Sequence, residues 1–131
     1  MLRTLACLGF AAALAMPALA NEGEYIFDAL KHPAYRKAWA KMMAGEKALP
    51  EWVRSGNITA TPSVVVNIDG AEYEFHNGCK PHDCGGNTLE VMFPAGGGQA
   101  WGLLQIDGQP PQFLGKPDGP RKIALERAIR Q

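Results

Sequence analysis

The sequence predicts an α+β domain in which a central antiparallel sheet of four or five strands is flanked by helices. Apolar residues recur at helical spacing near both ends of the chain, whereas the segment after Gly56 alternates between polar and apolar residues. Helices first, strands in the middle and one helix last favour a layered packing, with the helices covering one face of the sheet.

The first twenty residues are typical of a secretory signal peptide. A basic start at Arg3 precedes an apolar run over 5–16, and Ala18 and Ala20 have the small-residue spacing of a cleavage site. We expect cleavage after Ala20 and export. A lipoprotein leader ending at Cys7 is the competing interpretation, but only six residues precede this cysteine, too few for the basic and apolar parts of such a signal.

Cleavage would leave residues 21–131, which is the size of one domain. Loss of Arg3 leaves 12 basic residues against 13 acidic ones, a formal charge of −1. This balance provides no concentrated basic face for nucleic acid. No later segment has the roughly 20 apolar residues that a membrane helix needs. We therefore predict one soluble domain that binds neither nucleic acid nor membrane.

Three segments after the leader are predicted to be helical. The first covers 33–45 and the second 49–56, each with a proline near its start and a glycine at its end. The first helix has an apolar stripe of Tyr35, Ala38, Trp39, Met42 and Met43. The last helix begins at Pro120 and places Ile123, Ala124, Arg127 and Ala128 at helical spacing.

The strands begin with a predicted hairpin. Residues 63–68 (SVVVNI) and 71–76 (AEYEFH) flank the Asp-Gly pair at 69–70, which is typical of a two-residue turn. Alternation places Tyr73 and Phe75 on one face of the second strand.

Alternation resumes at 88–93 (TLEVMF), so the hexapeptide CKPHDC at 79–84 connects two strands and lies at an edge or tip of the sheet. Further strands are predicted over 100–106 and around Phe113 and Leu114.

The hexapeptide holds the two cysteines that remain after cleavage, Cys79 and Cys84, and a disulfide is their expected state in an exported protein. Thiol redox centres separate their cysteines by two residues at a helix start, whereas four separate these. A structural zinc site that included His82 would need a fourth ligand and reduced thiolates. A cysteine nucleophile activated by His82 cannot attack from a disulfide. The simplest alternative is a disulfide that only stabilises the loop.

A six-residue ring stabilises a fold by only roughly 2 kcal/mol in the chain-entropy model. Together with Pro81 it also restricts a segment that would otherwise lose backbone entropy on binding a partner. So small a ring directs Lys80, His82 and Asp83 outward. The sequence therefore predicts a preorganised projection.

These residues resemble the loop of the Inhibitor of vertebrate lysozyme (Ivy) family of Gram-negative bacteria. The likeness covers the run C-K-P-H-D-C, the Gly-Gly step after it, the following L-E-V-M-F strand and the order of helices before sheet. It implies a periplasmic, noncatalytic protein, often a homodimer, that blocks the active-site cleft of c-type lysozyme and uses no cofactor or metal. His82 would enter between the two catalytic carboxyl groups, with Lys80, Pro81 and Asp83 as accessory residues.

Three other functions compete with this hypothesis, and the first is a periplasmic thiol redox or metal-binding protein built on the same two cysteines. The target could be the bacterium's own lytic transglycosylases, whose single catalytic carboxyl group His82 could also engage. The domain could instead bind peptidoglycan by stacking sugars on tryptophans, but Trp39, Trp52 and Trp101 lie in predicted helices or strands, where burial is the ordinary outcome.

Overall fold

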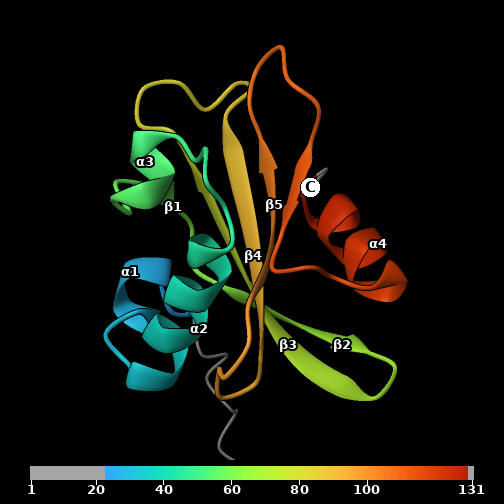
Figure 1. Cartoon of the computed structure of the whole chain (residues 1–131). Helices are drawn as coiled ribbons and strands as arrows, with labels where there is room; N and C mark the ends of the chain where they lie inside the picture. Colours follow the sequence, from blue (N-terminus) through green and yellow to red (C-terminus); the bar gives the residue numbers. More distant parts are fainter. Residues whose placement is uncertain (1–22, 130–131) are drawn as a thin grey trace, which may run out of the picture.

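The computed structural model describes residues 23–129 (Figure 1). The predicted leader over 1–20, with Cys7 and the cleavage site after Ala20, lies outside the described residues. The helices and strands in chain order are α1 (Ile26–Ala29), α2 (Pro33–Ala44), α3 (Glu51–Arg54), β1 (Thr59–Ala60), β2 (Val64–Ile68), β3 (Ala71–Cys79), β4 (Thr88–Pro94), β5 (Trp101–Gln105), β6 (Gln112–Leu114) and α4 (Gly119–Ala128).

The predicted fold class is confirmed, because the strands form one antiparallel sheet that helices flank (Figure 1). The strand order is β1-β3-β4-β5-β6, and β2 also pairs with β3. β2 pairs with the first half of β3 and β1 with its last two residues, so the two share one edge. The described sheet has six strands rather than four or five because the two-residue β1 was not predicted. The four-residue helix α1 was also missed.

The predicted hairpin joins β2 and β3. Asp69 and Gly70 have φ angles of +52° and +85°, the left-handed pair that a type I′ turn requires. The register places Val64 opposite Phe75 and Val66 opposite Tyr73, so these side chains share one face of the sheet.

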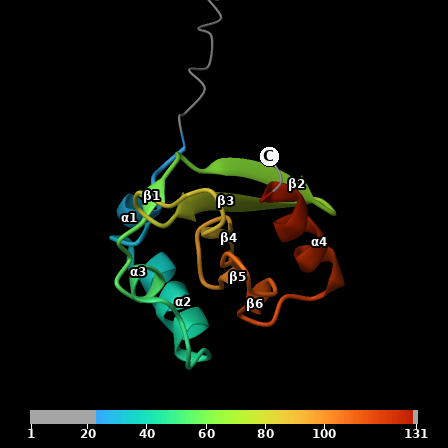
Figure 2. The same cartoon turned by 90° about the horizontal axis from the view of Figure 1, so that it is seen from above.

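Helices cover both faces of the sheet, so the prediction that they cover one face is wrong. Figure 2 shows α1, α2 and α3 on one side and α4 on the other. Within β4, Leu89, Val91 and Phe93 pack in the core beneath α1–α3, whereas Met92 packs in the core beneath α4. The strand still alternates, but both of its faces are apolar except at Thr88 and Glu90, and β4 is buried on both sides.

Two cores result from this arrangement. The core between the sheet and α1–α3 contains Ile26, Ala38, Trp39, Met42, Leu49, Trp52, Val53, Leu89, Val91, Phe93, Ala100, Leu104 and Leu114. The core beneath α4 contains Phe75, Met92, Trp101, Leu103 and Leu125. The predicted stripe of α2 is confirmed, since three of its members belong to the first core and the other two pack against it.

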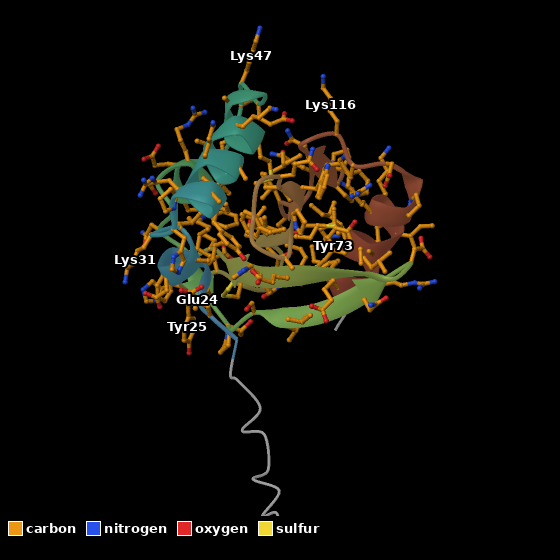
Figure 3. The ribbon with its side chains drawn as sticks, turned by 90° about the horizontal axis from the view of Figure 1, so that it is seen from below. Glu24, Tyr25, Lys31, Lys47, Tyr73 and Lys116 are labelled. Carbon is orange, nitrogen blue, oxygen red and sulfur yellow. A yellow bond between two sulfur atoms is a disulfide. The ribbon has the colours of Figure 1, made fainter. Side chains whose placement is uncertain are left out.

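The start of α4 is fixed to the sheet through Arg121. The Asp118 carboxylate caps the helix by accepting the Arg121 backbone N–H at 3.1 Å. The Arg121 guanidinium lies 4.2 Å from the centroid of the Trp101 ring and donates to the Tyr73 hydroxyl at 3.1 Å. Tyr73 accordingly lies between the sheet and α4 (Figure 3).

The buried face of α4 differs from the predicted one. Leu125, which the helical spacing did not select, is 0% exposed, whereas the selected Ile123 is 50% exposed. Ala124 and Ala128 pack against the core as predicted. Leu125 thus carries most of the apolar contact of the helix.

We expect Leu125→Ala to lower the free energy of unfolding by about 2–5 kcal/mol, because it removes a fully buried side chain and leaves a cavity. Ile123→Ala on the same helix is the matched control and should lower it by less than about 1 kcal/mol. Urea denaturation of both variants measures the difference. Equal losses would show that α4 does not pack through Leu125.

Candidate functional site

The hexapeptide CKPHDC follows β3 and leads into β4 at one end of the sheet. It belongs to the yellow loop at the top of Figure 1. Cys79 is the last residue of β3 and pairs with Thr88, the first residue of β4. The Lys80 backbone N–H donates to the Asn87 carbonyl at 3.0 Å, which extends the pairing by one step. The loop therefore begins and ends on the longest strand pair of the described sheet.

The predicted disulfide between Cys79 and Cys84 is present, with a Cα–Cα distance of 5.0 Å. It closes the loop across six residues and leaves neither sulfur as a thiolate, which excludes both from metal ligation and nucleophilic attack in this form. Within residues 23–129, no group of three or more His, Cys, Asp or Glu side chains is arranged to hold a metal ion.

Inside the ring, residues 80–83 form a tight turn. The Asp83 backbone N–H donates to the Lys80 carbonyl at 3.0 Å, Pro81 occupies the second position, and His82 has a φ of +62°. Proline followed by a left-handed residue is the pattern of a type II turn, whose third position is usually glycine or asparagine. A side chain in that conformation costs roughly 1–2 kcal/mol. The fold thus holds the exposed His82 in a backbone conformation that lowers the stability of the folded state.

Lys80 and Asp83 lie on either side of His82. The Lys80 ammonium is 3.5 Å from an Asp83 carboxylate oxygen, and the two side chains are 45% and 54% exposed. A pair this exposed contributes at most about 1 kcal/mol to stability. It does hold one positive and one negative charge together at the tip. The Asp83 carboxylate thus contacts Lys80, and the accessory roles of Lys80, Pro81 and Asp83 stay predictions.

The loop rests on two contacts that the sequence did not suggest. Asn87 is 7% exposed and its side-chain amide donates to the Asp83 carbonyl at 3.4 Å. Gly86 lies against the β5–β6 connection, where a Cβ atom would be 3.0 Å from the Cβ of Asp107. The sequence signal that could have indicated the Asn87 contact is an asparagine placed directly after Gly-Gly and before a strand. These contacts limit how far the loop can move against the sheet.

The tryptophans do not form a stacking platform. Trp39, Trp52 and Trp101 are 9%, 9% and 8% exposed, and they belong to the two cores. Their burial contradicts the peptidoglycan-binding alternative, which needs exposed rings.

Sequence reasoning also missed two buried titratable residues near the loop. His76 is 2% exposed, its ring meets that of Phe93 edge to face at 5.5 Å, and burial lowers its pKa to about 4. Glu90 is 3% exposed, accepts from the Asn77 amide at 2.9 Å, and burial raises its pKa to about 7. They lie on adjacent strands and on opposite faces of the sheet, so each adds a polar group to a different core.

These features define a small α+β domain with a rigid loop at one end of its sheet. An exposed histidine is presented on a disulfide-closed turn, and the rest of the loop serves to hold that turn against the sheet. Over residues 23–129 no helix is long and apolar enough to cross a membrane.

Comparison with known proteins identifies the family. The family described as Inhibitor of vertebrate lysozyme (Ivy) matches residues 34–128. The chain is 37% identical over 117 residues to the Inhibitor of vertebrate lysozyme of Pseudomonas aeruginosa, covering 88% of this chain and 76% of that protein. It is 34% identical over 91 residues to the Inhibitor of vertebrate lysozyme of Escherichia coli, covering 70% and 57%. An uncharacterized protein of Pseudomonas aeruginosa is 35% identical over 122 residues, covering 92% and 77%. The chain belongs to the Ivy family.

The left-handed turn predicts how stability responds to substitution at position 82. His82→Gly should leave the free energy of unfolding unchanged or raise it by up to about 1 kcal/mol, because glycine adopts positive φ without steric cost. His82→Val should lower it by at least about 1 kcal/mol, since a β-branched side chain is least compatible with this conformation. Urea denaturation distinguishes the two. A glycine variant less stable than the valine variant would contradict the turn described here.

The two buried groups predict opposing pH dependences. The folded-state pKa of Glu90 lies above its ordinary value of 4.5. Its contribution to the free energy of unfolding is therefore fully present below pH 4.5 and is lost as pH rises through about 7. The folded-state pKa of His76 lies below its ordinary value of 6.5, so its contribution is present above pH 6.5 and is lost as pH falls through about 4. Each change amounts to roughly 3 kcal/mol, and the two largely cancel between pH 4.5 and 6.5.

Removing one of the two groups should reveal the pH dependence of stability that the other one causes. As pH falls from 6.5 to 4.5, Glu90→Gln should lose stability relative to wild type, and His76→Leu should gain it. Urea denaturation at the two pH values measures both, and the remaining titratable groups are common to all three proteins. The same pH response in both variants would show that the groups do not titrate as described.

Proposed function

We propose that the chain is a periplasmic inhibitor of c-type lysozyme that inserts the CKPHDC loop into the active-site cleft. Its signal peptide would direct export and be cleaved after Ala20. The observation that carries the proposal is the exposed His82 at the corner of a turn closed by the Cys79–Cys84 disulfide. Two relatives named as inhibitors of vertebrate lysozyme support the choice of target.

The chemistry of the target suits an imidazole. Retaining glycosidases act through two carboxyl groups about 5–5.5 Å apart. The two ring nitrogens of His82 point away from each other, and the protonated ring can donate to one carboxyl group from each nitrogen. A charge-assisted hydrogen bond contributes about 1.5–3 kcal/mol. The ring would occupy the substrate position without presenting a bond that the enzyme can cleave, so inhibition is competitive.

The loop is built to lose little entropy on binding. Immobilising a flexible segment costs about 1–2 kcal/mol of backbone entropy per residue. The disulfide, the fixed φ of Pro81 and the contact of Asn87 with Asp83 remove much of that freedom before the partner arrives. These restraints explain why a short loop would be an effective inhibitor.

The neighbouring charges fit the same role. Asp83 alone would be repelled by the carboxylates of a lysozyme cleft. Lys80, 3.5 Å away, compensates that charge and leaves a tip of no net charge around His82. Lys80 and Asp83 thus adapt the loop to an acidic cleft, and they are secondary to His82.

A homodimer is a further part of the proposal. The resemblance to the family predicts it, and on β2 the side chain of Val65 is 63% exposed on the face of the sheet opposite α4. Light scattering on the purified mature protein tests it, and a mass of one chain at micromolar concentration would contradict it.

The decisive experiment titrates hen lysozyme with wild-type protein and with His82→Ala. We expect the variant to raise the inhibition constant by at least about a hundredfold, since two charge-assisted bonds are lost. His32→Ala is the matched control, because His32 is also exposed but lies between α1 and α2, where it contacts Glu24 at 3.2 Å. The control should inhibit like wild type.

Absence of inhibition by wild-type protein would refute the proposed target, and full inhibition by His82→Ala would refute the proposed mechanism. A parallel assay with a lytic transglycosylase addresses the competing target. Stronger inhibition of that enzyme than of lysozyme would assign the protein to control of the cell's own glycan cleavage.

A further inference from the structure

A groove separate from the loop runs between α4 and the face of the sheet formed by the β2–β3 hairpin and β4. Its volume is about 760 Å³, within the range of small-molecule sites. Val64, Val66 and Phe75 line it from the sheet, and Ile123 and Ala124 line it from α4.

The walls of the groove are apolar and uncovered. Val64, Val66 and Ile123 are 59%, 39% and 50% exposed, and all three face the groove. Val65, between the two valines, is 63% exposed but pairs with Glu74 and points to the other face of the sheet. Branched apolar side chains exposed together on one face indicate a surface that a ligand covers.

The floor of the groove is polar. Glu90, at 3% exposure, forms part of the lining beside Asn77, whose amide donates to it at 2.9 Å. The hydroxyl oxygen of Thr88, also in the lining, is buried and has no hydrogen-bond partner among the described residues. A buried carboxyl group and an unpartnered hydroxyl both cost free energy that a suitable donor would recover.

We infer that this groove binds an aliphatic primary amine, with its ammonium group at Glu90 and Thr88 and its hydrocarbon chain along Val64, Val66 and Ile123. The floor offers two acceptors to an ammonium group, the Glu90 carboxylate and the unpartnered Thr88 hydroxyl. An alkyl chain along this wall also removes the exposed valines from water, which favours binding.

The other charged residues around the groove do not make it a site for an anion. Arg127 lines it from α4 and Asp69 from the hairpin turn, so the rim carries one charge of each sign. On β5 the residue paired with Glu90 is Leu103, which is apolar. The unbalanced charge at the floor is therefore that of Glu90 when it is ionised.

The ligand test uses n-hexylamine, 1-hexanol and hexanoate as probes of one chain length, titrated against the mature protein and followed by amide chemical shifts in two-dimensional NMR. Hexylamine should bind at least tenfold more tightly than either other probe at pH 8 and shift residues of β2, β4 and α4. Its affinity should fall about tenfold at pH 6, because burial raises the pKa of Glu90 to about 7 and protonation removes the charge. Equal affinity for hexanol, or shifts confined to other regions, would overturn the inference.

Three variants locate the site. Glu90→Gln keeps the shape of the side chain and should weaken hexylamine binding at pH 8 about tenfold while abolishing its pH dependence. Val64→Ser should weaken binding, whereas Val65→Ser on the opposite face should not, although the two valines are almost equally exposed. Unchanged binding in Glu90→Gln, or equal losses in the two valine variants, would refute the site. Lysozyme inhibition is measured separately, so failure here leaves the proposed function untouched.

Discussion

The pairing of β3 with β4 positions almost every feature of this molecule. Seven residue pairs join the strands, from Tyr73 opposite Pro94 to Cys79 opposite Thr88. The last pair sets the span that the hexapeptide must cross, and it places the disulfide directly on the strand end. Because β4 is packed on both of its faces, the turn that carries His82 ends on a rigid base. A loop of the same sequence on a frayed hairpin would not hold its histidine in one place.

Burial on both faces also explains the behaviour of the charged residues in these strands. A strand with one wet face can place its ionisable groups in water, whereas β4 has no such face. Glu90 and His76 are therefore pushed toward their neutral forms, the acid by a raised pKa and the base by a lowered one. The sheet keeps two polar groups in its interior without keeping two charges there.

Much of the fold could be predicted because its periodic segments are long. The apolar stripe of α2, the Asp69-Gly70 turn and the strand over Trp101–Gln105 each satisfy a local rule that tertiary packing did not override. The four residues of α1 and the two of β1 were missed because elements this short have no period to detect. The placement of α4 on the second face was missed because an apolar alternation in β4 reads the same whether one face or both are covered.

The candidate loop was predictable in its covalent part and not in its conformation. Two cysteines in an exported chain leave one possible pairing, so the disulfide followed from counting. The left-handed His82 could not be predicted, because that conformation is signalled by glycine or asparagine and this sequence has neither at the position. The support at Gly86 depends on the β5–β6 connection around Asp107, which only the folded chain brings near.

The conformation of His82 has a consequence for how this sequence can drift. Glycine or asparagine would meet the geometry of the turn at lower cost, so mutation under selection for folding alone would replace the histidine. If His82 acts as proposed, a lineage that no longer met lysozyme would lose the imidazole first and keep the ring of cysteines around it. The residue at the corner of the turn is thus the most sensitive record, within the loop, of whether binding is still under selection.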